Sequence, residues 1–155
     1  MLFRSGAASR DALEDFQGDR AEIAGIGLCG IRCCKTFLRA DGSLAEPVIS
    51  WMDERAYQPY RPDDPEVRWA TTCSGYLAHR FTGRLADTAA NCILLQWPID
   101  TDRWEWSDDD ALVASFRIPR EMLVELQLPG EVIGPLTGQA AAHTGLPAEI
   151  GRAHV

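Results

Sequence analysis

The sequence predicts a layered α/β domain, in which helices pack on the faces of a sheet. Two local patterns lead to this class. Residues 35–51 place the pair Asp41-Gly42 between two apolar runs, which is a strong hairpin signal. Residues 138–145 follow Thr137 and end at a glycine, the ordinary start and stop signals of a helix. A chain of 155 residues forms one domain, or part of one, with a buried core.

The first half of the chain should contain the end of a helix, a buried strand, the hairpin, a loop and a long helix. The strand consists of apolar residues and glycines, which is typical of a strand buried in a sheet. The long helix should start at Pro65 and end at Gly83, with apolar residues on both faces. In chain order, these elements cover residues 8–18, 22–31, 35–51, 53–65 and 65–83.

The second half should contain two short helices, a strand and a last helix. Ser107 is a natural N-cap for the first helix, and Asp110 completes a capping-box pattern. Pro119 suits the first turn of the second helix. These elements cover residues 107–116, 119–126, 131–137 and 138–145.

Composition and charge exclude several classes of protein. The formal net charge of -8 argues against a nucleic-acid partner, because binding phosphates needs a basic surface. No apolar run approaches the roughly 18–20 residues of a membrane helix, and the first residues do not resemble a signal peptide. The five cysteines are an odd number in a chain of this size, which favours reduced thiols. We therefore expect a cytoplasmic protein with no nucleic-acid or membrane partner.

The residues that most often carry chemistry do not form a familiar motif. Cys29, Cys33 and Cys34 have the spacing C-x3-C-C, which is not that of a zinc site. Neither His79 nor His143 has a serine or cysteine partner at a recognisable spacing. Small buried cysteines and structural histidines are the plain interpretation, with a metal or redox protein as an alternative. We predict no metal ligand and no catalytic residue within this chain.

Two further clusters have structural explanations. The acidic run at residues 108–110 follows Ser107 at an expected helix start, where carboxylates favour the helix dipole. Three tryptophans between residues 97 and 106 are one candidate for a surface that stacks on sugars, but tryptophans more often cover the edge of a core. No GxxxxGK[ST] phosphate-binding motif occurs.

Arg32, Trp51 and Asp53 form the most suggestive set. Arg32 follows the predicted strand, and the other two follow the hairpin, where ligands of α/β sheets usually bind. Arginine donates paired hydrogen bonds, aspartate accepts them, and tryptophan offers a flat apolar face. This set suits a polyhydroxylated ligand, and a structural Arg–Asp pair explains the residues equally well.

Three segments, in order, resemble the FGGY carbohydrate kinases. "IAGIGLCGIRCCKTFLRADGSLAEPVISWMDERA" is similar to the strand, loop and hairpin that lead into that family's Trp-x-Asp-x-Arg motif. "SGYLAHRFTGRLADTAAN" resembles its segment with Leu-Thr-Gly and then Thr-Asp. "FRIPREMLVELQLPGEVIGPLTGQAAAHTGLPA" resembles its Pro-started helix, its Gly-Glu-Val-Ile-Gly strand and its Gly-Leu-Pro-Ala end.

This resemblance implies a function. Members have two actin-like (ribonuclease-H-like) domains that close on a sugar and on ATP with Mg²⁺, and they transfer the γ-phosphate to a hydroxyl of a pentulose, hexulose or polyol. By position, Arg32, Cys33 and Trp51 match sugar-contacting residues, and Asp53 and Arg55 match the Trp-x-Asp-x-Arg motif. The resemblance also allows a homo-oligomer in the full-length protein.

The departures from the family pattern are equally informative. The family's Asp-x-Gly-Thr turn, on its first β-hairpin, does not precede Ala21, and its catalytic aspartate would follow the Gly-Leu-Pro-Ala segment. We therefore expect a partial actin-like domain, without its first β-hairpin and its C-terminal part, that is inactive alone and binds neither ATP nor Mg²⁺ tightly. The loop after Arg55 is also shorter than is usual in the family. The alternative is a naturally short, non-catalytic actin-like sugar-binding module.

The first and last residues of the chain suggest an origin different from that of the residues between them. Residues 150–155 back-translate to ATC GGA AGA GCA CAC GTC, and residues 1–5 to GTG CTC TTC CGA TCT, both of which match a sequencing-library adapter. The family resemblance breaks at the same point, because Glu149 stands where the family has glycine. We therefore expect residues 6–148 to be the kinase fragment, and residues 1–5 and 149–155 to be translated adapter.

Overall fold

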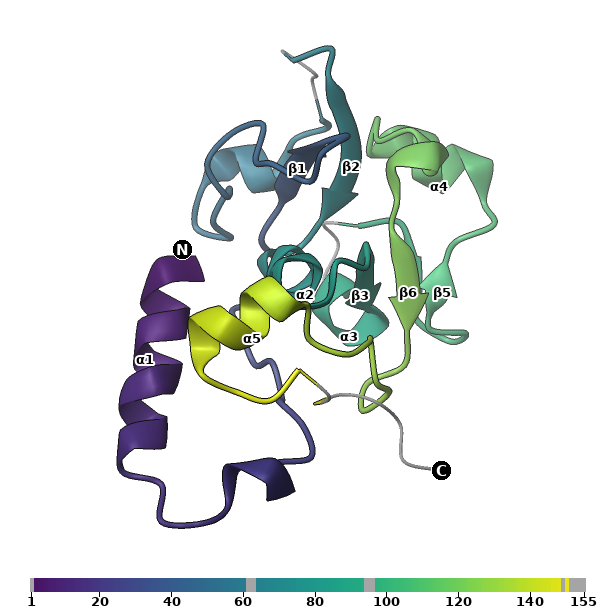
Figure 1. The fold of residues 1–155 in the computed structure, drawn as a ribbon. Helices are drawn as coiled ribbons and strands as arrows, with labels where there is room; N and C mark the ends of the chain where they lie inside the picture. The colour runs from purple at the N-terminus through teal and green to yellow at the C-terminus, as the bar shows by residue number, and fades with distance from the viewer. Residues whose placement is uncertain (1, 61–63, 94–96, 149, 151–155) are drawn as a thin grey trace.

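The computed structural model describes residues 2–60, 64–93, 97–148 and 150, and it shows a mixed α/β architecture. Three helices lie together on one side of the molecule, and short two-stranded sheets lie on the other (Figure 1). The helices are α1 (Leu2–Glu14), α2 (Cys73–Thr82), α3 (Ala89–Cys92), α4 (Asp110–Ser115) and α5 (Gly138–Thr144). The strands are β1 (Thr36–Arg39), β2 (Val67–Thr71), β3 (Ala86–Thr88), β4 (Ile99–Asp100), β5 (Glu105–Trp106) and β6 (Glu125–Gln127). Short 3₁₀ helices span Arg20–Glu22, Glu54–Tyr57 and Arg120–Met122.

The turn of the predicted hairpin is present, but its first strand, β1, pairs mainly with β2, which lies outside the hairpin. The turn at Asp41-Gly42 closes with a hydrogen bond from the Gly42 amide to the Arg39 carbonyl at 2.9 Å, and Gly42 has a left-handed φ of 75°. The returning arm touches β1 only through the bridges at Lys35–Ile49 and Leu38–Leu44. β1 instead pairs antiparallel with β2 along its whole length.

The prediction of one helix over residues 65–83 was half wrong. Val67–Thr71 is a strand, and the helix begins only at Cys73. Thr72 separates the two elements because its hydroxyl accepts hydrogen bonds from the amides of Ser74 and Gly75, which makes it the N-cap. The predicted end was right: Gly83 adopts the left-handed conformation and donates to the His79 carbonyl.

Two predicted strands are not strands in the structure. Residues 23–31 and residues 131–137 belong to no helix or sheet. Within the described ranges, no strand pairs with either segment, so their backbone groups form no ladder. An apolar sequence favours a strand only when a neighbouring strand accepts its hydrogen bonds.

In the second half, the helices near the two ends were predicted more accurately than the segment between them. The N-cap of α4 is Asp109 rather than Ser107, whose hydroxyl instead accepts from the Asp109 amide at 3.1 Å. The predicted helix over residues 119–126 was wrong: one 3₁₀ turn follows Pro119, and the chain then forms β6, which pairs parallel with β3 because its backbone finds a strand partner there. α5 was predicted correctly, including its cap at Thr137 and its left-handed stop at Gly145.

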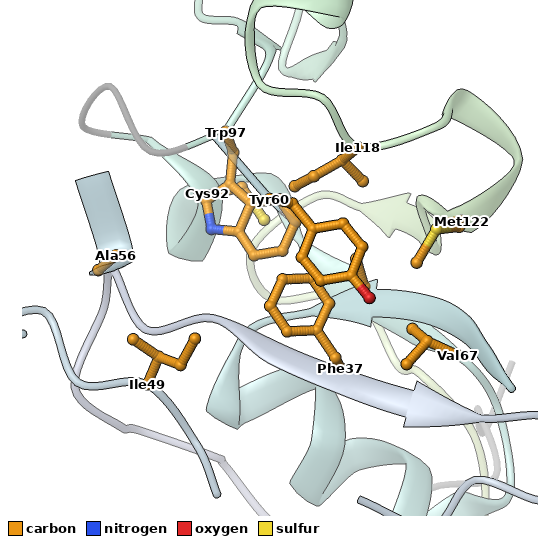
Figure 2. Packing of buried hydrophobic residues seen from close by; sticks show 10 residues of the cluster. Phe37, Ile49, Ala56, Tyr60, Val67, Cys92, Trp97, Ile118 and Met122 are labelled. Carbon is orange, nitrogen blue, oxygen red and sulfur yellow. The ribbon is translucent and has the colours of Figure 1, made fainter. Parts of the chain in front are cut away.

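The main core lies between the β1–β2 pair and the second half of the chain. The rings of Phe37 and Tyr60 stack with centroids 4.0 Å apart, and Trp97 and Cys92 lie beside them (Figure 2). Trp97 is fully buried, which confirms that it belongs to the core and not to a sugar-stacking surface. The ten buried members of this core are Phe37, Ile49, Ala56, Tyr60, Val67, Ala70, Cys92, Trp97, Ile118 and Met122.

A second, smaller core joins the helices. α5 packs between α1 and α2, and Phe81, Leu136 and Ala140 meet there. Ile150 is buried in the same core, and its carbonyl accepts from the Leu136 amide at 3.1 Å. The other residues of the expected adapter tail, 149 and 151–155, lie outside the described residues. No helix in the described part is long and apolar enough to cross a membrane.

Candidate functional site

The bridge between Lys35 and Ile49 brings the loop at residues 30–34 beside the end of the hairpin. Each backbone amide of this pair donates to the other residue's carbonyl, at 3.0 and 2.9 Å. The bridge lies two residues after Cys33 and two residues before Trp51. The structure therefore brings together the two chain segments that carry the predicted sugar-contacting residues.

Arg32 and Cys33 occupy the loop with opposite exposure. Arg32 is exposed, whereas the Cys33 side chain is buried and its thiol donates to the Ile93 carbonyl at 3.6 Å. Burial raises the pKa of the Cys33 thiol, although the positive charge of Arg32 partly opposes this rise. Cys33 also has a left-handed φ of 65°, which is uncommon for a residue other than glycine. Such a conformation fixes the direction of the loop at this position.

Trp51 and Asp53 stand at the other side of the candidate site. Trp51 is 45% exposed, so part of this residue is open to solvent. Asp53 does not pair with Arg32 in the described structure; its carboxylate binds the guanidinium of Arg55 through both oxygens, with the shortest bond at 2.6 Å. Asp53 also caps the following 3₁₀ turn by accepting from the Arg55 amide.

The Arg55 contacts set the charge state of Asp53. The hydrogen bonds from Arg55 lower the pKa of the Asp53 carboxyl to about 2. In turn, the Asp53 carboxylate raises the pKa of Arg55 further above its ordinary value. Both groups therefore stay ionised at neutral pH. The structural Arg–Asp pair that the sequence left open is present, but its arginine is Arg55.

A buried carboxylate that the sequence reasoning passed over lies under α2. Asp87 is almost fully buried and accepts from both threonine hydroxyls before the helix, Thr71 at 2.9 Å and Thr72 at 2.7 Å. It also accepts from the Thr72 and Thr88 amides and from the Asn91 side chain. The pattern Thr71-Thr72 before the helix and Asp87 before Asn91 was the available signal. This network joins β2, β3 and the start of α2.

A cavity of about 360 Å³ opens beside this network. Residues 24–28 form one wall, and residues 130–134 form another. Asp87 and Ser74 lie at its border, and a methyl group at Gly25 or Gly27 would meet no atom within 4 Å. The two segments that were predicted as strands therefore face this space without a strand between them.

Lys35, the single lysine of the chain, is a second unexpected feature. Its side chain is only 2% exposed, its ammonium donates to the Gln58 carbonyl at 3.4 Å, and it lies 6.0 Å from the centre of the Phe116 ring. Burial lowers the pKa of Lys35 to about 8. A charged amine with one long hydrogen bond in a core is costly.

The five cysteines are all free thiols. Within the described ranges, no group of three or more His, Cys, Asp or Glu residues is placed to hold a metal ion.

Comparisons with known proteins identify the class of fold. The chain superposes on a gluconate kinase and a ligand-bound xylulose kinase from Lactobacillus acidophilus, each with a TM-score of 0.76 over 96% of this chain and 36% of that chain. Both are 17% identical, and a xylulose kinase from Brucella ovis gives a TM-score of 0.73 at 22% identity, over 93% of this chain and 35% of that chain. These likenesses show that the chain has part of the actin-like fold of sugar kinases.

The sequence comparison finds a relative of much higher sequence identity. The chain is 48% identical over 141 residues to YgcE, an uncharacterised sugar kinase of Escherichia coli K12. The match covers 91% of this chain and 28% of YgcE. No protein-family model matches the chain. By sequence and fold together, the chain is similar to sugar kinases of the FGGY type, and it spans 28% of YgcE and 35–36% of the three solved kinases.

Proposed function

We propose that the chain is the sugar-binding part of an ATP-dependent kinase that transfers the γ-phosphate of ATP to a hydroxyl of a pentulose, hexulose or related polyol. The observation that carries this proposal is the 48% identity to a sugar kinase over 141 residues. Because the chain spans only 28% of that relative, the complete activity is assigned to a longer protein and not to these residues alone.

Within this function, Arg32, Cys33, Trp51 and Asp53 are assigned to the sugar. The Lys35–Ile49 bridge supports this assignment, because it brings the two segments that carry them side by side. The exposed Arg32 guanidinium donates to sugar hydroxyls, and the partly exposed Trp51 packs on the C–H face of the ring. The ionised Asp53 carboxylate, which Arg55 holds by a salt bridge, accepts from a hydroxyl.

ATP and Mg²⁺ belong to the longer protein in this proposal. The described residues include no cluster of carboxylates suited to Mg²⁺, and the sequence has no GxxxxGK[ST] phosphate-binding motif. When bound, ATP·Mg²⁺ supplies the phosphoryl group and neutralises its charge. The residues of this chain bind and orient the sugar, so the isolated chain should not turn over.

The first experiment is to sequence the source locus across both ends of the chain. If the reading frame continues through Ala148 and also extends upstream, the longer protein is expressed and assayed for ADP release against a panel of ketoses and polyols. We expect turnover by the longer protein and none by this chain. A frame confined to residues 1–155 would overturn the kinase assignment.

Matched tryptophan variants then test the sugar site. Trp51→Ala in the longer protein should raise the KM for the sugar more than tenfold, with a smaller effect on the KM for ATP. Trp104→Ala is the control, because Trp104 is also partly exposed but lies in the β4–β5 turn. Equal effects of the two variants would contradict the assignment of Trp51. Calorimetric binding of a sugar by this chain, without turnover by the longer protein, would favour the non-catalytic module.

A further inference from the structure

The thiols of Cys34 and Cys73 share one backbone oxygen. The Cys73 thiol donates to the Ile31 carbonyl with an S···O distance of 3.2 Å, and the Cys34 thiol donates to the same oxygen at 3.7 Å. Two cysteines that are far apart in the sequence are therefore close neighbours in the fold.

The backbone holds this arrangement in place. Residues 30–34 cross the N-terminus of α2, where Cys73 is the first helical residue after the Thr72 cap. A side chain at Gly30 would lie 2.9 Å from the Ser74 hydroxyl and 3.9 Å from the Cys73 sulfur, so the loop passes this point closely because it has none. The Cys73 thiol therefore lies in the first turn of α2, and the Cys34 thiol lies on residues 30–34, which cross this end of the helix.

We propose that Cys34 and Cys73 form a dithiol site that small disulfides, such as glutathione disulfide, convert into an intramolecular disulfide bond. The Cys73 thiolate attacks one sulfur of glutathione disulfide, which forms a mixed disulfide and releases one glutathione thiolate. The Cys34 thiolate then attacks the Cys73 sulfur and releases the second glutathione. The two protein thiols are oxidised, glutathione disulfide is reduced to two glutathione molecules, and these take up the two thiol protons.

Access distinguishes Cys73 from the buried cysteines. Cys73 is half-buried and can meet a small disulfide, whereas Cys33 and Cys34 are buried and Cys92 is completely enclosed in the core. Cys34 therefore acts second, on the mixed disulfide at Cys73, and the exposed Cys29 should give a mixed disulfide with glutathione. Burial raises the pKa of Cys73 to about 11, so its thiolate is scarce at neutral pH. The rate of oxidation should therefore rise about tenfold per pH unit between pH 7 and pH 9.

The test is oxidation of the reduced chain with glutathione disulfide, followed by alkylation, trypsin digestion and mass spectrometry without reductant. Cys33 and Cys34 fall in one tryptic tripeptide, residues 33–35, and Cys73 falls in residues 69–80. We expect these two peptides to be linked in the wild type and in Cys33→Ser, and unlinked in Cys34→Ser. Fragment ions of the wild-type linked peptide separate Cys34 from Cys33 even if a variant fails to fold.

Two results would overturn the proposal. The first is a wild-type digest with glutathione on Cys29 but no linked peptide after oxidation at pH 9. The second is a link that persists in Cys34→Ser, which would place Cys33 in the bond. The proposal concerns only residues of this chain, so its failure leaves the kinase function untouched, and the converse also holds.

Discussion

Residues 67–71 and residues 23–31 are both apolar, yet only the first segment forms a strand. β2 pairs with β1 along its length, and Ala70 also bridges to Leu123, so this strand has neighbours on two sides. In residues 23–31, Ile26 and Leu28 are each 39% exposed, and no described strand pairs with the segment.

The difference shows that partners, more than apolar residues, decide where a strand forms. Strand stability comes from cross-strand contacts and ladder hydrogen bonds, which residues 23–31 do not have here. An apolar segment with open edges also promotes edge-to-edge association. The cavity of about 360 Å³ beside it fits the same explanation, because no strand fills the space between residues 24–28 and 130–134.

The largest expected effect contrasts a core residue with one in the unpaired segment. Phe37→Ala removes a ring that stacks on Tyr60 inside the main core, and it should lower the free energy of unfolding by about 3–5 kcal/mol. Ile31→Ala, at a side chain that is 64% exposed, should change it by less than about 0.5 kcal/mol. Urea denaturation followed by circular dichroism measures both.

Similar losses for the two variants would contradict the comparison, because they would mean that residues 23–31 pack as tightly as β1. If Phe37→Ala does not fold, Phe37→Leu provides a milder test, with a smaller loss in the same direction.

Replacing Lys35 should raise the free energy of unfolding, whereas Phe37→Ala should lower it. Its pKa is lowered to about 8 in the folded chain from an ordinary value of 10.5, so its burial as an ammonium costs up to about 3 kcal/mol at pH 7. Lys35→Met fills similar volume without a charge and should stabilise the chain by up to that amount at pH 7. Urea denaturation at pH 7 and pH 10.5 measures the difference.

The dependence of the free energy of unfolding on pH shows whether the Lys35 ammonium destabilises the folded chain. Between about pH 8 and pH 10.5 the unfolded chain holds a proton on Lys35 that the folded chain has lost, so stability rises with pH in this window. Tyrosines and cysteines titrate in both proteins, so the difference between wild type and Lys35→Met isolates the lysine. That difference should shrink as the pH approaches 10.5. A difference that does not change with pH would show that the ammonium is solvated.

The Asp87 network should give the next effect. Asp87→Ala leaves the buried Thr72 amide and the hydroxyls of Thr71 and Thr72 without their acceptor, and should cost about 2–3 kcal/mol. Asp87→Asn keeps one carbonyl oxygen and should cost less. Asp102→Ala, at an exposed position, is the matched control and should change stability by less than about 0.5 kcal/mol. Thermal unfolding compares all three, and equal shifts for Asp87→Ala and Asp102→Ala would contradict a structural role for the network.

The sequence predicted the elements whose signals are local. Thr137 and Gly145 mark α5, Gly83 ends α2, and the Asp41-Gly42 pair forms its turn, because caps and turns depend on a few adjacent residues. It failed where the outcome depends on distant partners. Residues 67–71 have a helical pattern of apolar side chains, but β1 draws them into a sheet.

The candidate site likewise has features that the sequence predicted and features that it did not. Residue types placed Arg32, Trp51 and Asp53 in one ligand set, and the Lys35–Ile49 bridge does bring their segments together. Asp53 pairs with Arg55, two residues further on, and the sequence alone does not show which arginine the carboxylate binds. Lys35 was missed because burial of its side chain leaves no mark in the sequence, and Asp87 was missed because Thr71, Thr72 and Asn91 were not recognised as its hydrogen-bond partners.

The smallest expected effect concerns the exposed pair of Asp53 and Arg55. In the Arg55→Gln variant, the pKa of the Asp53 carboxyl should rise from about 2 towards its ordinary value of 3.8, as a carboxyl carbon NMR titration would show. Arg103→Gln, which removes two other exposed salt bridges, to Glu105 and Asp108, should leave that titration unchanged. Folded-state stabilisation by this pair is complete above about pH 4 and is lost as the pH falls towards 2. An Asp53 pKa that stays near 2 without Arg55 would assign the shift to the backbone amide.

Because both pKa values lie far below 7, Arg55→Gln does not change the charge of Asp53 at neutral pH. Any loss of sugar binding by this variant at pH 7 must then come from the position of the carboxylate and not from its protonation. In the longer protein, such a loss together with an unchanged KM for ATP would make Arg55 a positioning residue for Asp53. Unchanged sugar binding would show that the 3₁₀ turn after Asp53 holds the carboxylate without the ion pair.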